Sequence, residues 1–131
     1  MADVLLRLVA FAGACAHLLF AWRESVGWST GFVERVAPAW VARAGGDAQL
    51  DRAVDWAAPL ATNMAAYNLA LAIGLAWVTL AGAAVAGTLG VFLSVWLLIA
   101  AAAALRTGVL PAVWLQGGLG VALLVLSLVA A

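Results

Sequence analysis

The chain has 131 residues, of which 68% are hydrophobic and only 9% are charged, and its formal net charge is zero. This composition excludes an ordinary soluble domain, and the lack of a basic patch argues against a nucleic-acid partner. One cysteine and one histidine, Cys15 and His17, allow no intrachain disulfide and disfavour a transition-metal site. We therefore expect an integral membrane protein that uses neither a metal nor another cofactor.

Four apolar stretches are long enough to cross a bilayer, since a spanning helix needs about 20 residues. They cover about residues 4–22, 59–80, 83–105 and 109–130. No charge interrupts the chain between Leu69 and Leu105, and Gly82 marks a tight reversal between the second and third helices. The sequence predicts an all-α membrane protein with one membrane domain over residues 1–131, built as a four-transmembrane-helix bundle.

The first stretch contains Ala12-Gly13-Ala14-Cys15, which superficially resembles a signal-processing site. The basic residues that precede the apolar run of a cleavable signal are missing, because Asp3 comes first and Arg7 already lies within the run. We expect the first helix to be retained.

The segment of about residues 23–58 has the pattern of helices that lie in the membrane interface. Phe32, Val36 and Trp40 recur every four residues, as in an amphipathic helix, and Pro38 interrupts this helix. Gly45-Gly46 then separates it from a second helical piece. Three aspartates share one face of that piece: Asp47, Asp51 and Asp55. We interpret them as a solvated face rather than a cation site.

Arginine counting gives an orientation. The segment between the first two helices carries four arginines and the turn after the third helix carries one more: Arg23, Arg35, Arg43, Arg52 and Arg106. The opposite side offers only Arg7. Because basic loops stay in the cytoplasm, the long loop is expected to be cytoplasmic and both termini outside, in a bacterial inner membrane.

The third helix carries a stripe of small residues that repeats every four positions: Gly82, Ala86, Gly90 and Ser94. Such a stripe lets another helix backbone approach closely. It suits close packing inside one bundle or a homo-oligomer, and the sequence leaves both open. Apart from such a second copy, the partners we expect are membrane lipids and a lipophilic small molecule.

A few polar side chains interrupt the apolar helices. His17 and Glu24 are seven residues apart and share a face of the first helix. Asn63 and Tyr67 share a face of the second helix, whereas Asn68 points about 140° away from Asn63 and is expected to contact a different helix. Gln116 lies in the fourth helix. At about 1.5 Å per residue, these groups lie within roughly 6 to 12 Å of the loop-side interface, with Glu24 at the boundary.

This arrangement predicts an intramembrane polar pocket that binds a lipophilic small molecule. His17 and Glu24 are the candidate catalytic acid–base pair, and Asn63, Tyr67, Asn68 and Gln116 are the candidate ligand-binding residues. An enzyme of this kind would be a cofactor-independent isomerase, cyclase or hydrolase. Two alternatives remain open. The polar groups can satisfy one another as a structural network, or the protein can be a non-catalytic membrane subunit or a small transport or efflux component.

The same residues resemble the motifs of the DUF1304 family, short integral membrane proteins of bacteria and fungi that are defined only as a domain of unknown function. The matching motifs are His17-LLFAWR-Glu24, Asn63-MAA-Tyr67-Asn68 followed by Gly74-Leu75, and Gln116-Gly117-Gly118. Ala16 stands where the family often has an acidic residue, Met64-Ala65 replace a Gln-Gly pair, and the Tyr-Gly of the third helix is missing. The resemblance implies a four-helix membrane architecture without an established activity. The missing acidic residue weakens any mechanism that needs two carboxylates.

Overall fold

The computed structural model describes residues 1–42 and 47–130, and its secondary structure in these ranges is entirely helical. The helices are α1 (Ala2–Ser25), α2 (Thr30–Val36), α3 (Pro38–Val41), α4 (Asp47–Leu80), α5 (Ala83–Thr107) and α6 (Leu110–Ala130). Arg43 and the Gly45-Gly46 break lie outside the described residues.

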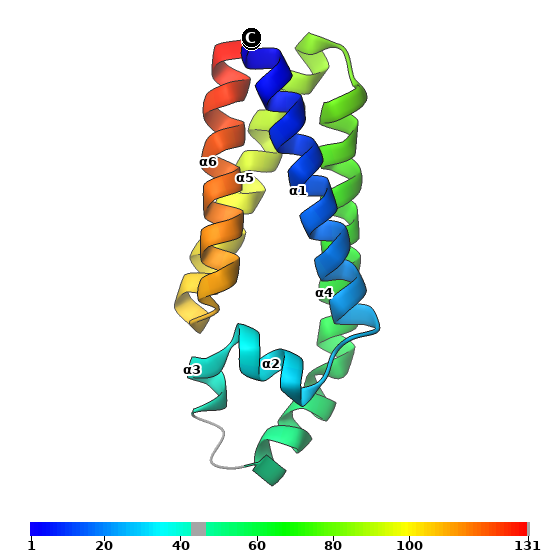
Figure 1. Ribbon diagram of the computed structural model, residues 1–131, viewed down its shortest axis with the longest axis vertical. Helices are drawn as coiled ribbons and strands as arrows, with labels where there is room; N and C mark the ends of the chain where they lie inside the picture. The colour runs from blue at the N-terminus through cyan, green and yellow to red at the C-terminus, as the bar shows by residue number, and fades with distance from the viewer. Residues whose placement is uncertain (43–46, 131) are drawn as a thin grey trace.

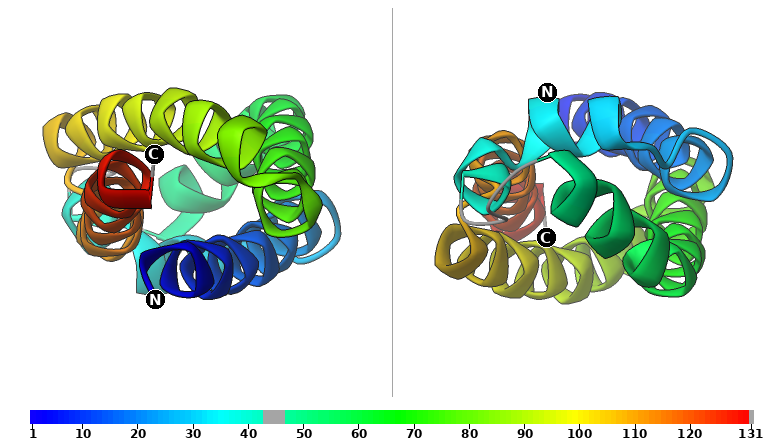
Figure 2. Two further views of the ribbon diagram at one scale, coloured as in Figure 1. Left: turned by 90° about the horizontal axis from the view of Figure 1, so that it is seen from above. Right: turned by 90° about the horizontal axis from the view of Figure 1, so that it is seen from below.

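The four long helices form an antiparallel bundle. α1 packs mainly on α4 and α5 mainly on α6, and the two pairs meet through α1 with α6 and α4 with α5 (Figure 2). α1 begins and α6 ends at the same end of the bundle, here called the terminus side, and α2 lies across the other end, here called the loop side (Figure 1). Each of the four is long and apolar enough to cross a membrane. The predicted all-α four-helix bundle is confirmed.

Short turns connect the antiparallel neighbours. α4 ends at Leu80 and Gly82 is the N-cap of α5, as the sequence predicts. α5 ends at Thr107, and its C-cap Gly108 has a φ of 79°, a left-handed conformation that glycine adopts without strain. The amide of Val109 then donates to the carbonyl of Ala104 over 3.0 Å, which satisfies one of the last carbonyls of α5.

α4 begins at Asp47, well before the expected start at Pro59, so the second interfacial piece and the second spanning helix are one continuous helix. Its 34 residues span about 51 Å at 1.5 Å per residue, whereas the hydrocarbon core is about 30 Å thick. Pro59 removes one backbone donor within this helix. The part of α4 that precedes Pro59 stays helical because α2 packs on this part. Val33 of α2 is buried there with Leu50 and Val54 of α4.

The small-residue stripe of α5 is used inside the chain. Ala86, Gly90 and Ser94 are buried, and only Gly82 is exposed at the turn. A Cβ added to Gly90 would overlap the hydroxyl oxygen of Ser127 on α6, so glycine is needed for this close approach. The stripe therefore packs α5 against α6. A homo-oligomer stays a prediction, and it would need a different face.

The larger buried hydrophobic cluster lies toward the terminus side of the bundle. Its members come from the first part of α1, the last part of α4, α5 as far as Leu97 and the last part of α6: Leu6, Ala10, Ala14, Leu75, Val78, Ala86, Leu93, Leu97 and Leu123. Toward α2 the two helix pairs diverge (Figure 1).

Side chains on the inner face of α4 show the consequence of this divergence. Leu71 packs against the core, but Met64, two helical turns earlier on the same face, is 51% exposed. Leu60, one turn further toward the loop side, is 54% exposed. We call the loop-side half of the bundle, where the two pairs diverge, the loop-side opening. Phe20 of α1, Leu60, Met64 and Tyr67 of α4, and Gln116 of α6 belong to this half of their helices.

Candidate functional site

Three polar side chains form a hydrogen-bond chain in the seam between α1 and α4. His17 Nδ1 lies 2.7 Å from Asn68 Oδ1, and Asn68 Nδ2 donates to Glu24 Oε2 over 2.7 Å. All three are buried, and His17 is fully so. Both bonds cross between the helices, so the chain fixes the rotation of α1 relative to α4 on the loop side of the core.

Small residues allow the two helices to come close enough for these bonds. On α1 the face that carries His17 and Glu24 also carries buried alanines, and on α4 the face of Asn68 does the same. These alanines are Ala10, Ala14 and Ala21 of α1 and Ala61, Ala65 and Ala72 of α4. Alanine permits a short distance between backbones, and short polar side chains can then reach across.

The orientation of the Asn68 amide determines which ring nitrogen of His17 carries a proton. The amide nitrogen donates to Glu24, so the amide oxygen is left facing His17. This oxygen can only accept, and Nδ1 must therefore be the donor. In a neutral imidazole Nε2 then holds the lone pair and acts as an acceptor or a base. Glu24 acts on His17 through Asn68, not by direct contact.

Nε2 of His17 is buried and has no hydrogen-bond partner among the described residues. Phe20, one turn along α1, is half-buried and lies edge-on to the imidazole, with the ring centroids 6.3 Å apart. Buried acceptors are nearly always paired, so an unpaired one calls for a partner.

The other predicted ligand-binding residues lie elsewhere around the loop-side opening. Asn63 and Tyr67 are exposed, Tyr67 by 74%, on the face of α4 that turns toward α5. Asn68 contacts α1 instead, in keeping with its predicted offset from Asn63. Gln116 is half-buried on the face of α6 that also carries Gly120, and it bonds to no described residue. The structure thus brings Asn68, not Asn63 or Tyr67, to His17, and the ligand roles stay predictions.

Glu24 does not form an ion pair with its neighbour Arg23. The Arg23 guanidinium lies over the ring of Trp22, 5.2 Å from the ring centroid, while the Glu24 carboxyl turns inward to Asn68. The Glu24 carboxyl therefore forms its hydrogen bond between α1 and α4 and not with a group at the membrane interface.

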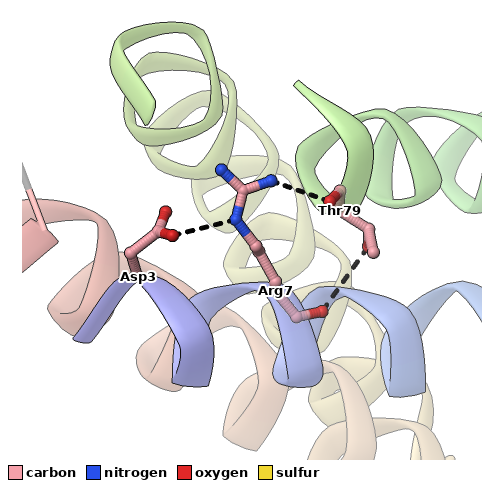
Figure 3. Close-up of polar contacts among 3 residues, drawn as sticks. All are labelled: Asp3, Arg7 and Thr79. Carbon is pink, nitrogen blue, oxygen red and sulfur yellow. Dashed lines mark hydrogen bonds and ion pairs between the residues drawn. The ribbon is translucent and has the colours of Figure 1, made fainter. Parts of the chain in front are cut away.

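A second polar cluster, which sequence analysis missed, joins the same two helices at the terminus side (Figure 3). Arg7 Nε donates to Asp3 Oδ2 over 3.0 Å, and Arg7 Nη1 donates to the carbonyl of Thr79 over 2.8 Å. Thr79 lies in the last turn of α4, where carbonyls lack a partner within the helix. Arg7 therefore caps α4 from α1. The four-residue spacing of Asp3 and Arg7 could have indicated their ion pair. Nothing in the sequence indicated that Arg7 also bonds to Thr79 on α4.

The remaining surface offers less chemistry. An apolar groove of about 830 Å³ lies between α4 and α5, and its one hydroxyl, on Thr88, already bonds to the carbonyl of Ala84. Within residues 1–42 and 47–130, no group of three His, Cys, Asp or Glu side chains lies close enough to hold a metal ion.

Comparison of the chain with protein-family models, with curated proteins and with solved structures gives no match. The DUF1304 resemblance stays a prediction.

Proposed function

We propose that this membrane protein binds a lipophilic small molecule in the loop-side opening and that the molecule donates a hydrogen bond to Nε2 of His17. The observation that carries the proposal is the buried, unpaired Nε2 at the end of a chain that fixes it as an acceptor. An unsatisfied buried acceptor costs about 1 to 3 kcal/mol, and a ligand that donates to it removes this cost. A lipophilic ligand also covers inner-face side chains such as Met64.

The polar groups around the opening suit the rest of such a ligand. Tyr67 and Asn63 are exposed on α4 in this half of the bundle, and Gln116 is half-buried on α6. Their hydroxyl and amide groups can bond to oxygen or nitrogen atoms of the ligand nearer the interface. Membrane lipids occupy the opening when the ligand is absent.

The chemistry that this site favours is proton transfer within one molecule. Nε2 of neutral His17 is a base held in place by Asn68, and the carboxylate of Glu24 holds Asn68. An amide does not readily pass a proton, so Glu24 cannot exchange one with His17 through Asn68. A proton taken by Nε2 therefore returns to the ligand. Among the three enzyme classes expected from the sequence, an isomerase fits this arrangement better than a cyclase or a hydrolase.

The orientation follows from the same arginine counting as before. Arg23, Arg35, Arg52 and Arg106 lie toward the loop side, and Arg7 lies on the terminus side. We place the loop side in the cytoplasm and both termini outside, in a bacterial inner membrane. The loop-side opening then faces the cytoplasmic leaflet.

Native mass spectrometry of the protein in mild detergent tests the proposal. The wild type is expected to carry a discrete small molecule, and H17L is expected to lose it because leucine cannot accept a hydrogen bond. T88V is the matched control, since it also removes a polar side chain from a spanning helix but far from the opening. A wild type without bound mass, or equal retention by H17L, would overturn the proposal and favour a non-catalytic membrane subunit.

A further inference from the structure

The charge of Glu24 holds the Asn68 amide in one orientation. A carboxylate can only accept hydrogen bonds, so the amide nitrogen must be the atom that meets Glu24 Oε2 over 2.7 Å. A hydrogen bond to a charged acceptor is roughly twice as strong as a neutral one, and the reverse orientation would set the amide oxygen against the carboxylate. Whether Nε2 of His17 accepts or donates therefore depends on a charge that His17 itself does not contact.

A proton on Glu24 removes this constraint. A protonated carboxyl has both a donor and an acceptor, so it can bond to either end of the Asn68 amide. In the reversed arrangement the carboxyl donates to the amide oxygen, and the amide nitrogen donates to Nδ1 of His17. The proton of the neutral imidazole is then on Nε2. The same three side chains can thus present Nε2 as an acceptor or as a donor without a change in the helices.

Among the members of this hydrogen-bond chain, Glu24 takes up the first proton. A proton on Glu24 removes the one charge of the buried chain, whereas a proton on His17 adds a second charge. Charges are costly away from water, so the neutral arrangement is favoured. Glu24 also lies in the last turn of α1 and is 8% exposed, whereas His17 is fully buried. Glu24 is therefore the member that exchanges protons with water more readily.

The other titratable and charged side chains of the described helices do not join this hydrogen-bond chain. On α1, Arg23 lies over the ring of Trp22, and on α4, Tyr67 is 74% exposed on a different face from Asn68. α6 carries no charged residue. On the loop side, the charged side chains that the structure describes on α2, α4 and α5 are all exposed: Glu34, Arg35, Asp51, Arg52, Asp55 and Arg106. Glu24 is therefore the side chain whose charge orients Asn68.

We propose that protonation of Glu24 frees the Asn68 amide to turn over, so that Nε2 of His17 changes from a group that only accepts to one that also donates. Glu24 takes one proton from water. When the amide turns, His17 gives its Nδ1 proton to water and takes one from water on Nε2, so the ring stays neutral. The chain of three side chains binds one proton in total.

This switch regulates the site of the proposed function, and its effect on binding rests on that proposal. While Glu24 is charged, the site takes ligands that donate a hydrogen bond, such as alcohols. Once Glu24 is protonated, the site also takes ligands that accept one, such as ketones and esters. Uptake of a proton and binding of an accepting ligand then favour each other. The base at Nε2 is fully available only in the charged state.

Nitrogen NMR reads the switch directly, because His17 is the one histidine of the chain. Protein labelled with isotopic nitrogen in histidine and purified through a histidine-free affinity tag gives signals from this ring alone. A ring nitrogen that carries a proton resonates apart from one that does not, so the spectra report the Nδ1 and Nε2 forms. The Nδ1 form is expected to predominate at about pH 9. Toward about pH 4, the ratio of the two neutral forms is expected to change by about tenfold or more, because the charge-assisted bond is lost.

Variants assign the change to Glu24. E24Q removes the charge but keeps a side chain that can donate or accept, and both neutral forms are expected at every pH. D55N is the matched control, because it also changes a carboxylate to an amide, at an exposed position of α4. It is expected to titrate as the wild type does. If E24Q does not fold, the wild-type titration alone decides the inference.

The outcomes distinguish the inference from the proposed function. A change in the neutral forms with pH that E24Q abolishes and D55N keeps supports the switch. Protonation of both ring nitrogens without a prior rise of the Nε2 form, or a wild-type pattern in E24Q, overturns the switch. The proposed function then stands, since Nε2 stays an acceptor. A wild type that carries its ring proton on Nε2 at about pH 9 overturns both.

Discussion

Asn68 joins α1 to α4 through both of its amide groups, so the seam depends on this one side chain. N68L leaves Nδ1 of His17 and the Glu24 carboxyl buried without partners. Each orphaned group costs about 1 to 3 kcal/mol, and we expect the free energy of unfolding to fall by about 2 kcal/mol or more. Denaturant-induced unfolding in mixed micelles, followed by tryptophan fluorescence, measures this loss.

N63L is the matched control, because Asn63 lies on the same helix but is exposed. Its replacement orphans no buried group, and stability should stay within about 0.5 kcal/mol of the wild type, as for most surface substitutions. Equal losses in the two variants would contradict the role of Asn68 in the seam.

Prediction from sequence singled out His17, Glu24 and Asn68 but not the hydrogen bonds that join them. The spacing of His17 and Glu24 places both on one face of α1, and the angular offset of Asn68 sends it to a different neighbour from Asn63. Which face of α4 meets α1 depends on its rotation. That rotation is set by contacts such as Arg7 with the Thr79 carbonyl, which no local pattern reveals. Asn63 and Tyr67 were therefore grouped with His17, although the structure brings Asn68 there.

At the scale of the elements, α4 shows how tertiary packing overrides a local signal. Proline favours a helix start at Pro59, and the apolar run begins there, so sequence alone divides this helix. The structure keeps it continuous because α2 covers the extension. Trp28 Nε1 donates to the carbonyl of Val54 over 3.0 Å, and Val54 itself is buried with Val33. The four spanning helices needed no such contact to be predicted, since their length and apolarity suffice.

W28F tests the bond between α2 and the extension. Phenylalanine keeps a ring that can pack edge-on against Phe32, as Trp28 does at 6.0 Å, but it lacks the indole N–H. We expect a loss of about 1 kcal/mol confined to this region, seen as faster amide exchange in Thr30–Val36 and residues 48–58. Exchange in α5 should not change. W22F is the control, because Trp22 is 53% exposed at the end of α1. Equal acceleration in both variants would contradict the bond's role.

The two ends of the molecule are built differently. At the terminus side the leucine core and the Arg7 cap hold the helices together, and beyond Gly13 and Gly74 the pairs diverge toward α2. His17, whose Nε2 is unpaired, lies on the loop side of the leucine core. The orientation of the protein in the membrane therefore determines which leaflet supplies the proposed ligand. Apolar periodicity could not predict the divergence of the pairs, because periodicity indicates which face of a helix is apolar but not how far apart two helices lie.

Cysteine labelling decides that orientation. In a C15A background, G82C reports the terminus-side turn and T107C the loop-side turn. Gly82 has a φ of −62° and open space where a Cβ would lie, and Thr107 is exposed, so both sites tolerate cysteine. The loop side carries Arg106 and most other arginines, whereas Arg7 on the terminus side is paired with Asp3. We therefore expect a membrane-impermeant maleimide to label G82C in intact spheroplasts, and T107C only after permeabilisation. Labelling of both after detergent lysis is the control. The reverse pattern would place the loop-side opening in the outer leaflet.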